Sequence, residues 1–273
     1  MAPRLGIVAG SGELPALLIS ACHATGRSYF VLAIEGHAEP DRLKGEPQAW
    51  IRLGQGGKGI ELLHDAGVQD LVFAGAVRRP GLAELRPDAK TAKVLARVGR
   101  AWAGDNTLLS AIIDEVESEG FRVVATHSLL TDCLATEGAY GKEIPDDVAR
   151  GDIERGIAAV HAIGALDVGQ AAVVQQGVVL DVEGADGTDA LIERCKTLHR
   201  AGPGGVLVKV QKPGQERRVD LPAIGVTTIT VAARSGLRGI AVEAGGALVF
   251  DAEAIAREAD WTKIFVVGVA LLD

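Results

Sequence analysis

The beginning of the chain most constrains its fold. A short aliphatic segment at residues 5–9 runs directly into the glycine turn GSGELP at residues 10–15 and then into an apolar helical stretch. Pro15 suits the first turn of a helix, because its missing N–H would have no partner there. Further strand-like segments follow at residues 29–34 and 70–77. The alternation predicts β-α-β units and therefore a parallel, doubly wound, Rossmann-like sheet over residues 1–125.

The pattern changes in the second half of the chain. Residues 131–150 are irregular and are predicted to be a linker between a Rossmann-like nucleotide- or phosphate-binding domain at 1–130 and a mixed α/β domain at 151–273. In the second domain the sequence predicts a hairpin that turns at Gln176 and Gly177. It also predicts helices at 153–166 and 188–198, and strands at 206–210, 224–230, 239–242, 248–251 and 264–271.

Composition excludes several classes of protein. The formal net charge of −8 argues against a general nucleic-acid binder, which would carry a basic balance. The three cysteines have no metal-binding or redox spacing and suit a reducing cytosol. No signal peptide is visible, and no apolar run reaches the roughly 18–20 residues that span a bilayer. We therefore expect a soluble, cytoplasmic α/β protein.

A basic cluster stands out in the second half. Within ten positions the chain carries four cations, Lys209, Lys212, Arg217 and Arg218, with Asp220 just behind them. Lysine and arginine gathered near a Pro-Gly turn are what a phosphorylated, anionic ligand requires. Since the whole chain is acidic, the cluster indicates a focused site for a small anion. A solvated, charged turn is the alternative interpretation.

The glycine turn predicts an anion cradle formed by Gly10, Ser11 and Gly12. Glycines let backbone N–H groups approach a phosphate, and the following helix adds partial positive charge. The turn is not the dinucleotide fingerprint, because Pro15 stands where the third glycine would be. Arg78 and Arg79 follow the strand predicted at 70–77, at the edge where ligands bind in such sheets. A structural turn and a surface arginine pair are the alternatives.

Carboxylates concentrate between residues 181 and 189. Thr188 is predicted to cap the following helix, and Asp189 in the first turn favours the helix dipole. Helix capping does not account for the carboxylate of Glu183, which is followed by a glycine. Mg²⁺ takes oxygen ligands and is usually held by one or two carboxylates together with substrate phosphates. At least one of Glu183, Asp186 and Asp189 is therefore expected to contact a metal or ligand, whereas the scattered histidines do not indicate zinc.

These segments, taken in order, resemble the LpxI family of UDP-2,3-diacylglucosamine pyrophosphatases. The resemblance covers essentially the whole chain. It rests on residues 6–15, 73–80, 104–105 with 108–109, 167–170, 182–183 with 187–189, 209 with 212–213, and 218–225. Small departures lie in the 76–80 segment and at Arg217, which replaces a less charged position.

The resemblance implies hydrolysis of UDP-2,3-diacylglucosamine to UMP and 2,3-diacylglucosamine 1-phosphate in lipid A biosynthesis, with Mg²⁺ or another divalent cation. It places catalysis in residues 151–273. The implied catalytic residues are Asp220, Lys209, Lys212 and Arg218, and Asp220 would bind Mg²⁺ or orient the water. The predicted substrate-binding residues are Gly10, Ser11, Gly12, Arg78, Arg79, Gln170, Thr188 and Thr228. The predicted metal ligands are Asp220, Glu183 and Asp189.

The expected partner is therefore a lipid-linked UDP-sugar and not a nucleic acid. Peripheral contact with the inner membrane and a homodimer are both left open by the sequence. Two other functions compete with hydrolysis. The Rossmann-like start also suits an NAD(P)-dependent oxidoreductase, although Pro15 weakens that reading. A non-enzymatic sugar-nucleotide binding protein would keep the cations but would not need Asp220.

Overall fold

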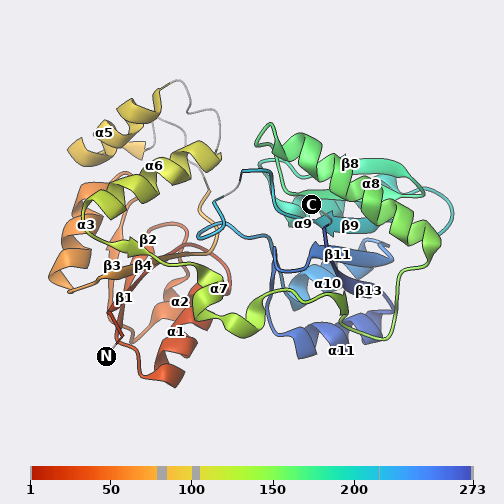
Figure 1. Cartoon of the computed structure of the whole chain (residues 1–273), viewed down its shortest axis with the longest axis horizontal. Helices are drawn as coiled ribbons and strands as arrows, with labels where there is room; N and C mark the ends of the chain where they lie inside the picture. Colours follow the sequence, from red (N-terminus) through yellow and green to blue (C-terminus); the bar gives the residue numbers. More distant parts are fainter. Residues whose placement is uncertain (1, 79–84, 100–104, 215, 272–273) are drawn as a thin grey trace. The chain divides into compact units, whose positions relative to one another are not determined.

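The computed structural model describes residues 2–78, 85–99, 105–214 and 216–271 (Figure 1). The chain forms two compact units. Unit 1 comprises Met1–Leu130 and Glu216–Val219, and unit 2 comprises Thr131–Gln215 and Asp220–Asp273. The stretch 131–150, for which we predicted a linker, contributes η2 (Thr131–Cys133), β6 (Gly138–Ala139) and the start of α8 (Asp147–Gly164). The functional roles assigned to the two domains stay predictions.

Unit 1 is built around a parallel sheet in the order β3-β2-β1-β4-β5. Its strands are β1 (Leu5–Ala9), β2 (Tyr29–Ile34), β3 (Gln48–Ile51), β4 (Asp70–Ala74) and β5 (Arg122–Val123). Its helices are α1 (Leu14–Thr25), α2 (Pro40–Leu43), α3 (Gly56–Asp65), α5 (Ala89–Val98), α6 (Asp105–Ser118) and α7 (Thr126–Leu129). The predicted α/β class with a parallel sheet is confirmed. The prediction missed β3 and extended β4 three residues too far, to Val77.

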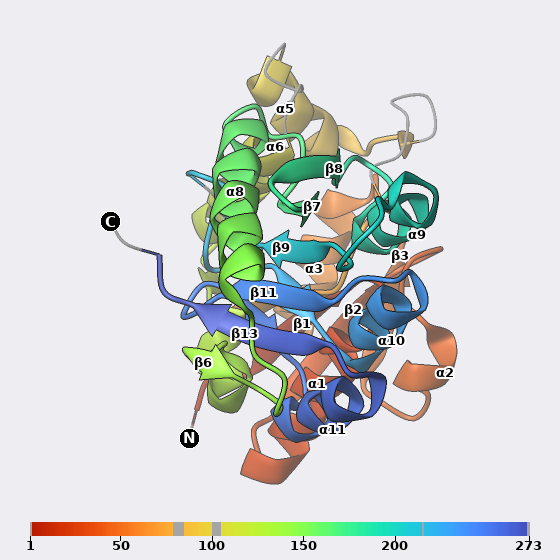
Figure 2. The ribbon, with the colours of Figure 1, turned by 90° about the vertical axis from the view of Figure 1, so that its right-hand side faces the viewer.

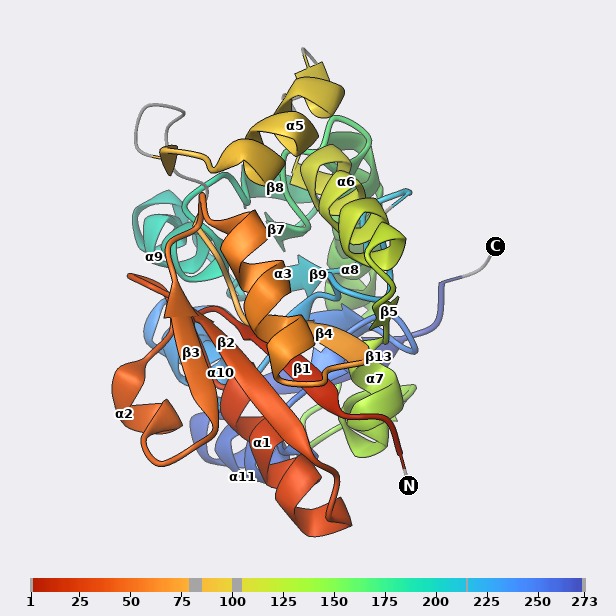
Figure 3. The same ribbon diagram turned by 90° about the vertical axis from the view of Figure 1, so that its left-hand side faces the viewer.

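Helices cover both faces of this sheet (Figure 3). Leu18 and Ile19 of α1 pack with Ile7 and Val31 on one face. On the other face, α3 and α6 bury Ile60, Leu63, Ile113 and Val116 against Leu32 and Leu71. The strands are therefore buried on both sides, which explains why they read as continuous aliphatic runs.

Unit 2 contains a mixed six-stranded sheet in the order β6-β13-β11-β9-β7-β8 (Figure 2). The further strands of the unit are β7 (Ala171–Gln175), β8 (Val178–Val182), β9 (Val206–Lys209), β10 (Ala223–Ile224), β11 (Gly239–Glu243), β12 (Leu248–Val249) and β13 (Phe265–Val269). Strands β9, β11 and β13 are parallel, β7 runs antiparallel to β9 and β8, and β10 pairs with β12 in a separate small sheet. The predicted mixed α/β class of this half is confirmed.

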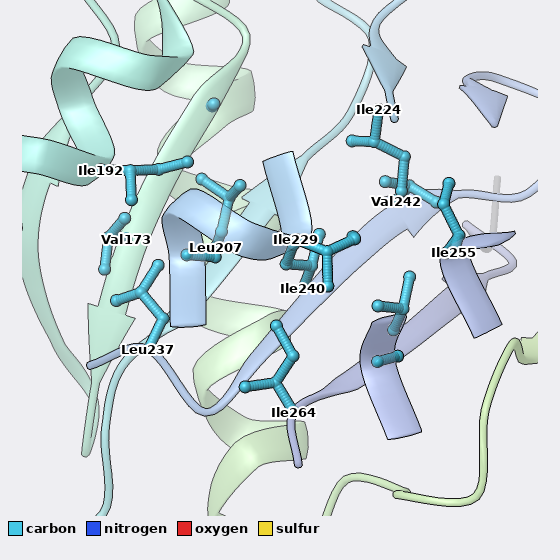
Figure 4. Packing of buried hydrophobic residues seen from close by; sticks show 14 of the residues in the cluster. Val173, Ile192, Leu207, Ile224, Ile229, Leu237, Ile240, Val242, Ile255 and Ile264 are labelled. Carbon is cyan, nitrogen blue, oxygen red and sulfur yellow. The ribbon is translucent and has the colours of Figure 1, made fainter. Parts of the chain in front are cut away.

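Helices again cover both faces of the sheet. One face carries α9 (Thr188–Leu198), α10 (Val226–Arg234) and α11 (Ala252–Thr262), which enclose a core that includes Ile192, Leu207, Ile229 and Ile255 (Figure 4). The other face is covered by α8. Gly156 of α8 lies so close to β9 that a Cβ there would meet Val208 Cγ2 at 2.4 Å. The helix therefore rests directly on the strand that ends at Lys209.

The prediction for residues 224–230 was wrong. We expected a strand there, because Val226, Thr227, Ile229 and their neighbours are β-branched. The structure instead forms helix α10 after the short strand β10. Ile229 and Ala232, three residues apart, face the core together, and the N-cap Gly225 donates its backbone N–H to Thr228 Oγ1 at 3.4 Å. Helical burial and capping override a modest local preference for strand.

Candidate functional site

In unit 1 the glycine turn lies at the point where the strand order reverses, between β1 and β4. Ligands bind at such points in open α/β sheets. Gly10 donates its N–H to the carbonyl of Ala74 at 2.8 Å, and Ser11 donates to that of Ala76 at 2.9 Å. A Cβ on Gly10 would lie 2.5 Å from Ala76 O. The packing of the turn against the end of β4 therefore requires glycine at position 10, whether or not an anion binds.

Gly12 has a φ of 93° and donates its N–H to Glu39 Oε1 at 3.1 Å. The Glu39 carboxylate also accepts from Arg42 Nε at 2.6 Å. Arg42, followed by the Gly12 N–H, holds the pKa of Glu39 below its usual value. The turn thus binds an anionic group, and in this structure that group belongs to the protein itself.

Of the two arginines predicted at this edge, the structure describes only Arg78. Arg78 is exposed, and its backbone carbonyl lies 3.1 Å from His37 Nε2. Arg79 lies outside the described residues. An arginine pair therefore stays a prediction here.

In unit 2 several of the predicted residues lie at one edge of the sheet. The strands β8, β9 and β11 all end there, so the edge carries Glu183, Lys209 and Glu243. The antiparallel strand β7 begins at the same edge, directly after Gln170. Helix α9 also begins close by, at Thr188. The strand order thus brings together side chains from four separate stretches of the chain.

Lys209 is the centre of this edge site. Its side chain is buried, and its Nζ donates to Thr188 Oγ1 at 2.8 Å and to the carbonyl of Ala223 at 3.1 Å. Burial lowers the pKa of the ammonium, and the negative charges of Glu183, Asp189 and Asp220 oppose this shift. Burying a cation is costly unless it is paired and hydrogen-bonded, so the three carboxylates and two acceptors explain how it is tolerated.

Glu183 and Thr188 continue the network from Lys209. The Thr188 hydroxyl donates to Glu183 Oε1, and the backbone N–H of Gln170 donates to Glu183 Oε2 at 2.8 Å. Both oxygens of this buried carboxylate therefore accept hydrogen bonds. Our prediction that Thr188 caps α9 was wrong: the N-cap is Gly187, at a φ of 85°, and Thr188 is the first helical residue.

The carboxylates near Lys209 allow a test of the predicted Mg²⁺ site. Glu183, Asp189 and Asp220 all act electrostatically on the ammonium, and oxygen donors are the chemistry that Mg²⁺ prefers. Within the ranges that the structure describes, no three His, Cys, Asp or Glu side chains are grouped to hold a metal by themselves. An ion at this edge would therefore need further ligands from a phosphate or from water. The metal role stays a prediction.

Other charged residues at the edge pair locally. Lys212 Nζ binds Asp167 Oδ1 at 2.7 Å, and Asp167 adopts a left-handed φ of 55° in the turn that follows α8. Arg194 of α9 pairs with Asp181 and Asp186. Asp186, which we considered as a metal or ligand contact, is thus a partner of Arg194. The sequence offered no signal for Arg194, because its partners lie eight and thirteen residues upstream.

Arg218 belongs to unit 1, whereas Lys209, Lys212 and Asp220 belong to unit 2. Its guanidinium binds both oxygens of Glu216 at 3.0 Å, and its NH1 binds Glu117 Oε1 at 2.8 Å. Glu216, followed by Glu117, raises the pKa of Arg218 while burial opposes the shift. The structure thus pairs this arginine with two carboxylates, and its predicted catalytic role stays a prediction.

The structure also places Thr228, Glu243 and Gln211 within unit 2. Thr228, a predicted substrate contact, accepts from Gly225 in the first turn of α10. Glu243 and Gln211 were missed by the sequence reasoning. Glu243 Oε2 accepts the backbone N–H of Gln211 at 2.9 Å, and the side-chain Nε2 of Gln211 is buried without a hydrogen-bond partner among the described residues. The position of Gln211 between Lys209 and Lys212 was the signal that could have found it.

Comparisons with known proteins match the order of these segments. Residues 4–133 match the model of the LpxI N-terminal domain, and residues 136–267 match that of the LpxI C-terminal domain. The "UDP-2,3-diacylglucosamine pyrophosphatase LpxI" of Caulobacter vibrioides is 42% identical over 273 residues, covering 97% of this chain and 97% of the relative. The chain belongs to the LpxI family. The predicted family is thereby confirmed.

Similarity to solved structures is much weaker. An N5-carboxyaminoimidazole synthase from Aspergillus clavatus is 8% identical with a TM-score of 0.25, covering 68% of this chain and 42% of that chain. A biotin carboxylase domain from Hydrogenobacter thermophilus is 10% identical with a TM-score of 0.29, covering 73% and 41%. Scores this low carry no argument about fold or function.

None of the helices among the described residues has the length and apolar character needed to cross a membrane.

Proposed function

We propose that this chain hydrolyses the diphosphate of UDP-2,3-diacylglucosamine in lipid A biosynthesis, releasing UMP and 2,3-diacylglucosamine 1-phosphate. The observation that carries the proposal is the 42% identity to a protein of that name over nearly the whole length of both chains. Family membership favours this hydrolase over the oxidoreductase and the non-enzymatic binding protein. The lipid-linked substrate also motivates peripheral contact with the inner membrane from the cytoplasmic side, and a homodimer is compatible with the reaction.

The edge site of unit 2 supplies suitable chemistry. Water adds to one phosphorus and breaks its bond to the bridging oxygen, which leaves on the other phosphate, and the water proton passes to a base or to solvent. Catalysis then consists mainly of positioning and of stabilising charge on the phosphoryl oxygens. The buried ammonium of Lys209 would stabilise those oxygens, and Lys212, released from Asp167, would add a second cation. Asp220 would orient the water or hold the metal.

We further propose that activity depends on Mg²⁺ or another divalent cation. Asp189 and Asp220 would hold it together with substrate phosphates, and Glu183 is the third predicted ligand. When bound, the metal would withdraw charge from the phosphate oxygens. In unit 1, Gly10, Ser11, Gly12, Arg78 and Arg79 stay the proposed contacts for nucleotide or phosphate. In unit 2, Gln170, Thr188 and Thr228 are the corresponding predictions, and Arg218 stays a proposed catalytic cation.

The decisive experiment incubates the purified chain with UDP-2,3-diacylglucosamine and Mg²⁺ and identifies the products by mass spectrometry. UMP and the acylated sugar 1-phosphate are expected in equal amounts. UDP and a free acylated sugar would refute cleavage within the diphosphate. Binding without turnover would support the non-enzymatic alternative. A change in NAD(P)H fluorescence on adding the protein would instead favour the oxidoreductase.

A further inference from the structure

The hydroxyl of Thr188 has no proton left for a ligand. A threonine hydroxyl donates one hydrogen bond and accepts others. In this structure the Thr188 hydroxyl donates to Glu183 Oε1 and accepts from Lys209 Nζ. Phosphate oxygens need a donor, so a hydroxyl that gives its proton to a buried carboxylate cannot bind them. The side chain of Thr188 is therefore directed to the interior of the network.

The carboxylate of Glu183 is committed in the same way. Its exposed fraction is 7%, and its two oxygens accept from Thr188 and from the backbone N–H of Gln170. A side-chain hydroxyl and a backbone N–H, on different segments, therefore fix its position. Such a carboxylate offers a rigid anchor for its neighbours, which is what precise placement of a functional group requires.

Lys209, at the other end of the network, keeps one donor in reserve. An ammonium has three N–H bonds. Two of them go to Thr188 and to the carbonyl of Ala223, and among the described residues no acceptor takes the third. An ammonium held by two hydrogen bonds with a third N–H left over can donate to one oxygen atom of an anion.

We propose that Thr188 and Glu183 are positioning residues that act through Lys209, holding its ammonium at the carboxyl end of β9 with one N–H left for a phosphoryl oxygen. This inference rests on the proposed function and deepens it. It replaces the roles predicted from sequence, namely substrate contact by the Thr188 side chain and metal binding by Glu183. A donor fixed before the reaction stabilises the transition state without the cost of reorganisation.

The test compares Thr188→Val, which keeps the shape but lacks the hydroxyl, with Thr188→Ser, which keeps the hydroxyl. Thr197→Val is the matched control, because Thr197 is exposed on the same helix and donates only to the carbonyl of Arg194 at 3.0 Å. We expect Thr188→Val to lower kcat by about 10- to 100-fold with KM within about twofold, since small misplacements of a catalytic group have effects of this size. Thr188→Ser and Thr197→Val should stay within about threefold of the wild type.

Glu183→Gln is the second variant, and it tests the same network independently should Thr188→Val fail to fold. It should also lower kcat, while the Mg²⁺ concentration that gives half-maximal rate stays within about twofold of the wild-type value. A rise of about tenfold or more in that concentration would place Glu183 on the metal and overturn the inference. So would a higher KM with unchanged kcat in Thr188→Val, wild-type kinetics in Thr188→Val, or a serine variant as impaired as the valine variant.

Failure of the proposed function is distinguishable from failure of this inference. If the wild-type chain makes no UMP, the proposed function fails and the inference fails with it. If the wild type turns over normally and any of the contrary outcomes is found in the variants, the inference alone fails.

Discussion

Replacing Lys209 by methionine separates the effect of its charge on stability from its effect on activity. The exposed fractions of Lys209 and Glu183 are 8% and 7%, so the ammonium and this carboxylate are both removed from water. The ammonium is linked to Glu183 through the Thr188 hydroxyl, and removing it leaves the buried carboxylate without a compensating charge. Leaving a buried charge uncompensated costs about 3–5 kcal/mol. Glu183 keeps its hydrogen bonds from Gln170 and Thr188. We therefore expect a loss at the lower end of that range, about 3 kcal/mol in the free energy of unfolding.

The double variant Lys209→Met/Glu183→Gln sharpens this prediction. It removes the uncompensated negative charge as well, so it should recover more than half of the lost stability. Asp189 is exposed and Asp220 is half-buried, so both keep more hydration than Glu183 and need less compensation. Activity should behave differently: kcat should fall by about 10²- to 10³-fold in the single variant, as for loss of one transition-state donor, and stay low in the double variant.

Urea unfolding followed by circular dichroism and steady-state UMP release are the two measurements. The control is Lys142→Met, since 89% of that side chain is exposed and it lies 3.7 Å from Asp260. Its unfolding free energy should change by less than about 0.5 kcal/mol. If the double variant were as unstable as the single one, the charge of Glu183 would not be the source of the loss. Near-normal turnover in Lys209→Met would refute the catalytic assignment.

Three other predictions follow from the fold and the proposed reaction. Asp220→Ala should abolish hydrolysis while circular dichroism and substrate binding stay largely unchanged, and near-normal turnover would contradict its catalytic role. Excess EDTA should remove activity and added Mg²⁺ should restore it, whereas full activity in EDTA would exclude the metal. Asp88→Ala should cost about 1 kcal/mol at pH 7, because Asp88 caps α5 and accepts from Thr91 N and Gly57 N, each at 2.8 Å. Burial would raise the pKa of Asp88, but these donors lower it on balance. The charged cap therefore stabilises the folded state above the unfolded pKa of about 3.9. When the free energy of unfolding is measured against pH, the difference between wild type and Asp88→Ala should shrink below about pH 4. A difference that grows in acid would contradict this prediction.

Local patterns predicted much of the fold. The turn at Gln176 and Gly177 has φ values of 51° and 77°, the left-handed pair that a two-residue hairpin uses, so the predicted hairpin was found where expected. The aliphatic runs of β1, β2 and β4 were also recognised, because strands buried on both faces need apolar side chains at every position. The short strand β3 was missed, since it has four residues and begins with Gln48, which leaves only a short apolar run.

Errors arose where burial competes with local preference. Residues 224–230 carry β-branched side chains and were predicted as a strand, yet α10 forms because its helical spacing turns Ile229 and Ala232 toward the core. The start of α8 at Asp147, six residues before the predicted start, follows from the cap in which Asp146 accepts the N–H of Ala149 at 2.8 Å. The helix α10 depends on core contacts that a local window does not contain, whereas the cap of α8 is a local signal that the sequence prediction overlooked.

The sequence by itself determined the class of the protein: alternating aliphatic strands and helices, an acidic surface with one basic cluster, and blocks in an order that identifies the LpxI family. Only the tertiary structure decided which charges meet. Within one cluster of cations, Lys209 is buried against Thr188, Lys212 pairs with Asp167, and Arg218 pairs with Glu216 and Glu117. Strand and helix preferences act over a few residues, whereas the meeting of Lys209 with Glu183 and Thr188 depends on the order of strands in a sheet, which brings residues 183 and 209 to one edge.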